Sequence, residues 1–159
     1  MDAAMRRELM EKYRTGPGKL ERSIDGLSES ELEFKPDPNK WSIREIVIHL
    51  CDSEIVGAYR IRSVLAEEGA FFTSYNQDKW AANLNYNKRN LNNALELFRL
   101  MRKSTGELFE DLCEEDWQRT GVHEERGRMT LLDLLELYAE HSENHVAQIR
   151  KIRLQLNNE

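Results

Sequence analysis

Three of the chain's four histidines stand where their side chains can meet. His141 and His145 are four residues apart in a segment of helical periodicity, so both point from one face of a helix. His49 lies in an earlier helical segment and can bring a third imidazole across from a neighbouring helix. Three neutral imidazoles with open positions beside them are suitable ligands for a divalent catalytic metal. The spacing therefore predicts a metal site at His49, His141 and His145.

The absence of a carboxylate from this set predicts an open site. The HExxH motif of many zinc proteases does not occur, and neither do the ExxH pairs of di-iron bundles. Without a carboxylate ligand, the divalent charge is balanced by water, hydroxide or an anionic substrate. Such a site lowers the pKa of a bound water or thiol. Three imidazoles accept several late first-row ions, so the residues alone do not select the metal.

Apolar periodicity predicts four helices that would position these histidines, at about residues 3–27, 42–68, 88–113 and 130–155. Ser42 and Glu45 fit a capping box at the start of the second helix, and Thr130 and Asp133 fit a weaker one at the start of the fourth. Pro17 is expected to break or kink the first helix. The sequence thus predicts an all-α four-helix bundle, one domain over residues 1–159, with a long crossover loop between the second and third helices.

The apolar stripes place the histidines on the inner side of the predicted bundle. On the last helix, His141 and His145 share one face with Tyr138 and Ile149. On the second helix, His49 falls at the edge of the apolar stripe. Buried, hydrogen-bonded structural histidines remain the alternative to metal ligands.

Two further polar residues are candidates for orienting the imidazoles. Asp52 lies three residues beyond His49, and Gln148 lies three residues beyond His145. Groups that hydrogen-bond to ligand histidines fix their tautomers. An ordinary role as polar helix residues stays open for both.

The segment 69–87 is long and aromatic, as expected for a crossover or a functional loop. Trp80 and Tyr86 in this segment are predicted to wall a substrate pocket. Arg60, on the face of His49, is predicted to hold an anionic group of a small-molecule substrate, with an internal ion pair as the alternative.

His123 lies in a predicted loop and is expected to be a surface residue or a loop hydrogen-bonder. Cys51 and Cys113 have no CxxC partner and are expected to be free thiols in or near the core. A reactive Cys51 near His49 is the alternative.

Charge and hydropathy exclude some classes of partner. The net charge of −6 is spread along the chain without a basic block, so no nucleic acid is expected. No apolar run reaches the length of a membrane span or a leader segment, so a cytoplasmic protein without a membrane partner is expected.

Four stretches together resemble the DinB-like superfamily, and its YfiT-like proteins most of all. They are W-S-I-R-E-I-V-I-H-L-C-D-S-E (41–54), Y-N-Q-D-K-W (75–80), G-V-H-E-E-R-G-R-M-T-L-L-D-L-L (121–135) and H-S-E-N-H-V-A-Q-I (141–149). The resemblance covers nearly the whole chain. Related sequences often have proline after the histidine that matches His123, whereas Glu124 follows here, so no role is carried over to that loop.

The resemblance implies a four-helix bundle, frequent homodimers, and a divalent metal held by the histidines numbered 49, 141 and 145 here. Nickel or zinc is the metal in many members, and iron and manganese stay open. Members with assigned activity transfer low-molecular-weight thiols such as bacillithiol or mycothiol, and others are described only as metal-dependent hydrolases. Thiol S-transfer to a small electrophile is therefore the leading hypothesis. Hydrolysis by metal-bound hydroxide and a non-catalytic metal-binding or interaction bundle are the alternatives.

Overall fold

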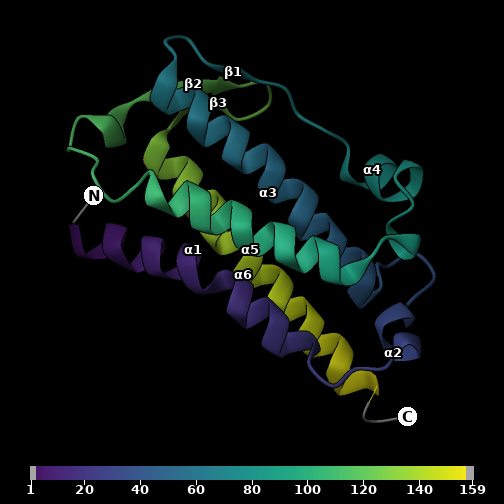
Figure 1. The fold of residues 1–159 in the computed structure, drawn as a ribbon. Coiled ribbons are helices and arrows are strands. Elements are labelled where there is room, and N and C mark those ends of the chain that lie inside the picture. The colour runs from purple at the N-terminus through teal and green to yellow at the C-terminus, as the bar shows by residue number, and fades with distance from the viewer. Residues whose placement is uncertain (1–2, 157–159) are drawn as a thin grey trace.

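The computed structural model describes residues 3–156, in which four long helices form the bundle that the sequence predicts (Figure 1). These helices are α1 (Ala3–Ile24), α3 (Ile43–Ala66), α5 (Leu91–Glu107) and α6 (Leu131–Leu156). Short helices α2 (Glu29–Glu33) and α4 (Gln77–Asn83) and 3₁₀ turns at Tyr86–Lys88 and Asp116–Gln118 lie in the connections. Three short strands, β1 (Phe71–Phe72), β2 (Thr120–His123) and β3 (Gly127–Thr130), complete the fold.

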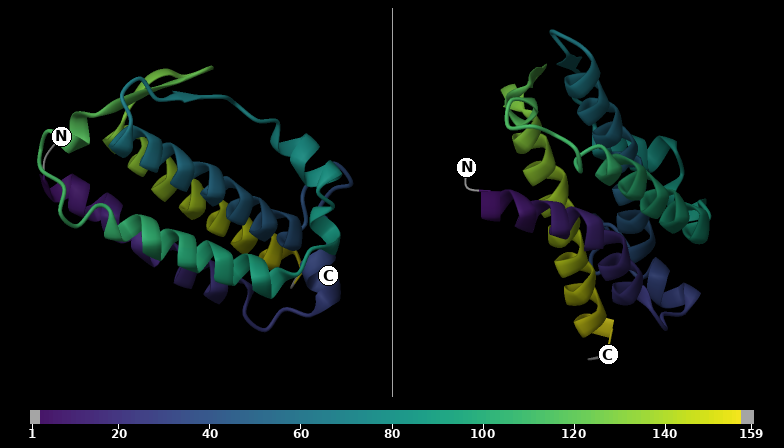
Figure 2. Two further views of the ribbon diagram at one scale, coloured as in Figure 1. Left: turned by 45° about the horizontal axis from the view of Figure 1, so that its top comes forward. Right: turned by 60° about the vertical axis from the view of Figure 1, so that its left-hand side comes forward.

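The order of the helices around the bundle brings α3 against α6. Helix α1 packs against α5 and α6, and α3 packs against the same two helices. Helices α3 and α5 run in the same direction, so the chain between them travels back along the bundle, as the predicted crossover requires (Figures 1 and 2). Helices α3 and α6 run in opposite directions side by side, which brings the middle of α3 to the middle of α6.

Both predicted capping boxes are confirmed. Ser42 Oγ accepts a hydrogen bond from the Glu45 amide at 3.2 Å, and the Glu45 carboxylate accepts one from the Ser42 amide at 2.8 Å. Thr130 and Asp133 make the same reciprocal bonds at 3.0 and 2.7 Å. These bonds satisfy amides that a helix leaves free at its N-terminus. They fix where α3 and α6 begin, and therefore which residues of these two histidine-bearing helices face the interior.

Of the break or kink expected at Pro17, the break is wrong, because α1 is helical from Ala3 to Ile24. Proline has no N–H for the Tyr13 carbonyl, which would leave that buried oxygen without a partner. Arg102 Nη1, from α5, donates to this oxygen at 3.0 Å. Gly16 leaves space for the Arg102 guanidinium, because a Cβ at this position would lie 2.6 Å from Arg102 Nη1. A tertiary contact therefore preserves the helix through the proline.

The small sheet was not predicted from the sequence. Strand β1 pairs in parallel with β2, and β2 pairs antiparallel with β3, where a loop was expected. Gly127 begins β3 at φ +73°, a conformation that costs glycine little. The sheet lies over the end of α3 and the beginning of α6 (Figure 1). It carries His123 toward the interior of the molecule.

The helix ends differ by a few residues from the expectation, most of all in the third helix, which ends at Glu107. The core consists of two apolar clusters, one on each side of the bundle's middle. Among the described residues, none of the helices combines the length and the apolar character that crossing a membrane requires.

Candidate metal centre

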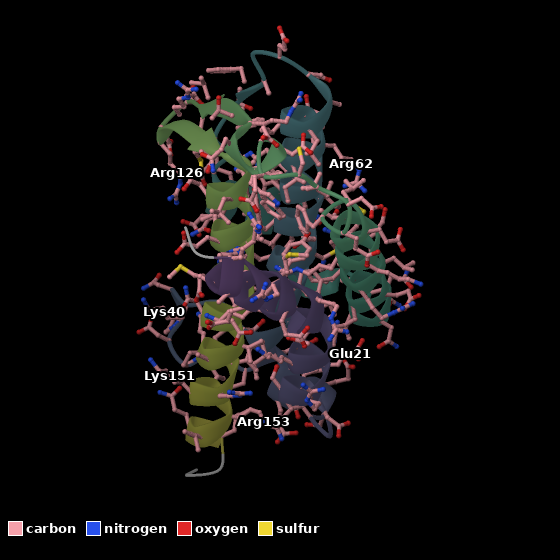
Figure 3. All side chains as sticks on the ribbon, turned by 90° about the vertical axis from the view of Figure 1, so that its left-hand side faces the viewer. Glu21, Lys40, Arg62, Arg126, Lys151 and Arg153 are labelled. Carbon is pink, nitrogen blue, oxygen red and sulfur yellow. The ribbon has the colours of Figure 1, made fainter. Side chains whose placement is uncertain are left out.

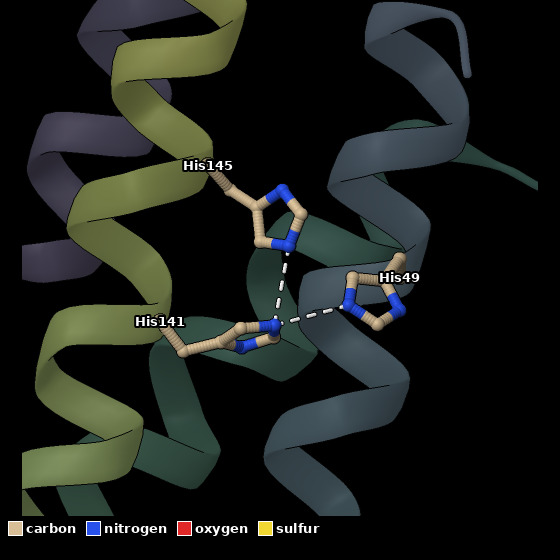
Figure 4. A group of neighbouring side chains, drawn as sticks. All are labelled: His49, His141 and His145. Carbon is tan, nitrogen blue, oxygen red and sulfur yellow. Dashed lines mark hydrogen bonds between the residues drawn. The ribbon is translucent and has the colours of Figure 1, made fainter. Parts of the chain in front are cut away.

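The three histidines predicted from spacing converge on one point between α3 and α6 (Figure 4). His141 Nε2 lies 3.1 Å from His49 Nε2 and 3.1 Å from His145 Nε2. One ligand atom from each of the three residues lies within 4.8 Å of the other two. A metal bound at about 2.0–2.1 Å to each nitrogen separates neighbouring ligand nitrogens by roughly 3.0–3.4 Å. The spacing of the imidazoles therefore fits a single ion.

Burial keeps these imidazoles neutral, which is the form that binds metal. Desolvation, with a smaller contribution from His145, lowers the pKa of His49 from 6.5 to about 3. Desolvation, followed by His145 and His49, likewise lowers the pKa of His141 to about 3. The pKa of His145 is also lowered by burial.

The hydrogen bond of His145 leaves a lone pair directed at the shared point. Gln148 Oε1 accepts the N–H of His145 Nδ1 at 2.9 Å, so Nε2 of the neutral His145 ring carries a lone pair. If His141 carried its proton on Nε2, this one N–H could not donate a full hydrogen bond to both His49 Nε2 and His145 Nε2. Nδ1 of the buried His49 has no hydrogen-bond partner among residues 3–156. One cation would satisfy all three Nε2 atoms, so the residues present fit a divalent metal.

A pocket of about 340 Å³ opens beside His49 and His141. Gly57 allows its wall to form, because a Cβ there would lie 2.6 Å from the Tyr138 ring. The pocket is lined by His49, Ser53, Arg60, Ser74, Tyr75, Gln77, His123, Glu125, Arg126, Leu137, Tyr138 and His141. The candidate centre is thus accessible to a small molecule from one side.

Of the two residues expected to orient the imidazoles, Gln148 hydrogen-bonds to one of the three histidines and Asp52 does not. Gln148 contacts His145, as the sequence suggested. Asp52 makes no side-chain hydrogen bond to His49; both of its carboxylate oxygens accept from Arg89 Nη1 at 2.8 Å. The His49 ring instead packs beside Trp41, with 4.7 Å between the ring centroids and an angle of 52° between the ring planes.

The two aromatic residues expected in the pocket wall lie elsewhere. Tyr86 is 0% exposed and packs in the core, so it does not wall the histidine pocket. Trp80 lines a neighbouring pocket of about 570 Å³ and packs on Tyr75 at 4.5 Å between ring centroids. Tyr75 and Arg60 line both pockets, and the contact of Arg60 with an anionic group stays a prediction.

His123 lines the pocket, although the sequence did not place it there. It is 5% exposed, so the expected surface position is wrong, whereas the alternative expectation, a residue that hydrogen-bonds within the loop, agrees with its bonds to the turn. Its Nδ1 accepts the amide N–H of Glu125 at 3.1 Å and that of Arg126 at 3.4 Å. A neutral His123 therefore carries its proton on Nε2. Burial, then the charge of Arg60, lowers its pKa.

The two cysteines do not contribute to the histidine cluster. Cys51 is buried, and desolvation followed by the Asp52 charge raises its pKa to about 11, which makes a reactive thiolate unfavourable. Cys113 is exposed rather than near the core, and its thiol donates to Asp116.

The lowered histidine pKa values predict an acid-sensitive metal-free protein. The unfolded chain binds protons on His49 and His141 near pH 6.5, whereas the folded chain resists them until about pH 3. The contribution of these neutral histidines to the free energy of unfolding is therefore fully present above pH 6.5 and is lost as the pH falls toward 3. Each histidine changes this free energy by at most about 1.4 kcal/mol per pH unit. Urea unfolding with a chelator at a series of pH values measures this. A His49→Gln/His141→Gln variant should show a shallower dependence, and parallel curves would contradict the assignment.

Known proteins are similar to this chain in sequence and in fold. The model of the DinB superfamily matches residues 12–149. A protein of Oceanobacillus iheyensis named "Putative metal-dependent hydrolase" is 26% identical over 136 residues, covering 86% of this chain and 78% of its own length. A Bacillus cereus (strain 03BB102) protein of the same name is 29% identical over 141 residues, covering 89% of this chain and 81% of its own.

Among solved structures, this fold is similar to YfiT from Bacillus subtilis, described as "a probable metal-dependent hydrolase with an unusual four-helix bundle topology". The TM-score is 0.92 at 22% identity, over 99% of this chain and 90% of that one. At this identity the likeness concerns the fold. Because the family model matches residues 12–149, well over half of the sequence, this chain belongs to the DinB superfamily.

Proposed function

We propose that this protein is a metal-dependent enzyme in which His49, His141 and His145 hold one divalent ion through their Nε2 atoms. The observation that carries the proposal is the convergence of three Nε2 atoms, 3.1 Å apart in two of the pairs, at the wall of an open pocket. Nickel and zinc are the proposed metals, with iron and manganese as the other ions to test.

The proposed reaction is the transfer of a low-molecular-weight thiol to a small electrophile. A bound divalent ion supplies Lewis acidity that lowers the pKa of a thiol or a water. The thiol proton leaves to solvent, the thiolate sulfur forms the new bond to the electrophilic carbon, and the leaving group takes the bonding electrons. Gln148 holds the His145 ring in the tautomer that this requires, and Arg60 and His123 line the space where the reactants would lie.

Hydrolysis is the second candidate, with water in place of the thiol. Its support is the name shared by the Oceanobacillus and Bacillus relatives, "Putative metal-dependent hydrolase". The two reactions use the same ligands and the same pocket, so the product distinguishes them.

The experiment is a product analysis by mass spectrometry. Protein loaded with nickel or zinc is incubated with bacillithiol, mycothiol or glutathione and a haloaromatic electrophile, beside a matched His145→Ala sample. We expect the thiol conjugate to form with the loaded wild type and to be lost in the variant. Formation of the water-derived product alone would overturn S-transfer in favour of hydrolysis. Absence of both products with a fully loaded site would favour a non-catalytic metal-binding role.

A further inference from the structure

Arg60 differs from the other buried arginines in having no carboxylate partner. Arg44, Arg60 and Arg102 are all buried, Arg60 with 5% of its surface exposed. Arg102 pairs with Glu54 and Arg44 pairs with Glu29. None of the ion pairs formed within residues 3–156 includes Arg60. A buried charge that is not paired is costly, so this position favours an anion from outside the chain.

Neutral acceptors hold the Arg60 guanidinium against the pocket without balancing its charge. Nη1 donates to the Tyr138 hydroxyl at 3.1 Å, and Nη2 donates to the Thr73 carbonyl at 2.7 Å. These bonds use two of the five guanidinium N–H groups. The side chain is thus fixed in place, with charge and donors left for a ligand.

Other groups around the pocket add to the attraction for an anion. His123, whose Nδ1 accepts two backbone amides, has its Nε2 proton available as a donor. Arg126 lines the same pocket from the turn between β2 and β3, on the outside of the molecule (Figure 3). Glu125 is the one carboxylate among the described residues that line it. With a divalent ion at the histidines, the pocket would have a net positive charge.

We propose that Arg60, assisted by His123, binds a carboxylate at the far end of the small molecule whose other end reaches the metal. His49 and Arg60 are eleven residues, about three helical turns, apart on α3, so the two anchors take opposite ends of one ligand. This inference rests on the proposed function and deepens it. It names the ligand class as carboxylate-bearing thiols. The carboxylate fixes the thiol's orientation, and Arg60 is a specificity-determining residue.

The test compares thiols that differ only in the distal group. Protein loaded with Co²⁺ is titrated with 3-mercaptopropionate and 6-mercaptohexanoate, each beside the mercaptoalcohol of equal length, and the thiolate-to-cobalt absorption band reports binding. A charge-assisted hydrogen bond predicts about tenfold or more tighter binding of the acid at the chain length that reaches Arg60. Arg60→Gln should abolish this preference, so that each acid binds no more tightly than the mercaptoalcohol of equal length.

Arg62→Gln provides the matched control. Arg62 is on the same helix but bonds to Ala58, Ser104 and Thr105, away from the pocket. This variant removes the same charge and should keep the wild-type preference. His123→Gln should reduce the preference for the acids without abolishing it. This variant tests the inference if Arg60→Gln does not fold. Equal binding of acids and alcohols by wild type, or an unchanged preference in Arg60→Gln, would overturn the inference.

Failure of the thiol proposal is separable from failure of this inference. If neither kind of thiol produces the band in cobalt-loaded protein, thiol binding at the metal is wrong. The carboxylate site is then measured alone, by calorimetric titration of glutarate into the metal-free wild type and the Arg60→Gln and Arg62→Gln variants. Glutarate binding lost only in Arg60→Gln supports the site, and absence of binding to wild type overturns it.

Discussion

Replacing Arg102 with methionine is expected to lower the free energy of unfolding by about 3–5 kcal/mol, as for other buried ion pairs that lose one partner. Arg102 is 2% exposed and its Nε donates to the Glu54 carboxylate at 2.8 Å. Methionine fills much of the same volume but leaves Glu54, itself 1% exposed, without its counter-charge. The hydroxyl of Tyr13 remains as a neutral partner of Glu54 and does not replace the charge.

The same substitution removes the donors that join three helices at the bundle centre. Arg102 donates to the Tyr13 carbonyl of α1 at 3.0 Å, and to the Ser142 hydroxyl and the Tyr138 carbonyl of α6. The Tyr13 oxygen is the acceptor that Pro17 leaves free. The loss therefore concerns the buried Tyr13 oxygen as well as an ion pair, and an unsatisfied buried acceptor adds its own cost.

Urea unfolding of the metal-free protein measures this effect, with Arg99→Met as the matched control. Arg99 is exposed on the same helix and pairs with Glu96, so its loss should change the free energy of unfolding little, because solvent screens an exposed ion pair. Arg102→Met/Glu54→Gln should regain part of the loss, because it removes the uncompensated carboxylate. A loss in Arg102→Met no greater than that in Arg99→Met would contradict the role of the network.

The second large effect is expected from His145→Ala, which should weaken divalent metal binding by more than about 100-fold. Loss of a group that only hydrogen-bonds to a ligand already costs 10–100-fold, and His145 is proposed as a ligand itself. Metal at 100 times the wild-type Kd stabilises the folded wild type by about 2.7 kcal/mol, whereas a 100-fold weaker site gains only about 0.4 kcal/mol. Competition with a chromophoric chelator and thermal unfolding with and without metal measure the two quantities.

Two further variants bracket this result. Gln148→Ala should weaken metal binding by about 10–100-fold, because Gln148 holds the His145 tautomer. His123→Ala should leave the affinity within a few-fold, since His123 lies on the pocket but outside the cluster. Wild-type affinity in His145→Ala would show that any metal binds elsewhere.

The sequence predicted the features that depend on local periodicity. A four-residue spacing puts His141 and His145 on one face whatever the tertiary fold, and the capping residues set the helix starts. A bundle with α3 beside α6 then brings His49 to the pair. The all-α class follows from the same periodicity, because four amphipathic helices must bury their apolar faces together.

The features that the sequence did not predict depend on partners distant along the chain. Asp52 turns to Arg89 of the crossover instead of His49, which periodicity on α3 alone cannot indicate. Tyr86 belongs to an aromatic segment, but its ring packs in the apolar core and not in the pocket wall. His123 reaches the pocket because an unpredicted parallel pair joins β2 to β1. Pro17 is tolerated because Arg102, 85 positions later in the sequence, supplies the missing donor.

The most direct test of the metal centre is X-ray absorption spectroscopy on the full-length protein loaded with one equivalent of zinc and then desalted. Three converging Nε2 atoms predict one retained ion per chain, with imidazole scattering from three nitrogens at about 2.0–2.1 Å and at least one further ligand from solvent. His145→Ala should lose that ion on desalting. Loss of zinc from the wild type, or a spectrum with fewer than three imidazoles, would contradict a centre built from His49, His141 and His145.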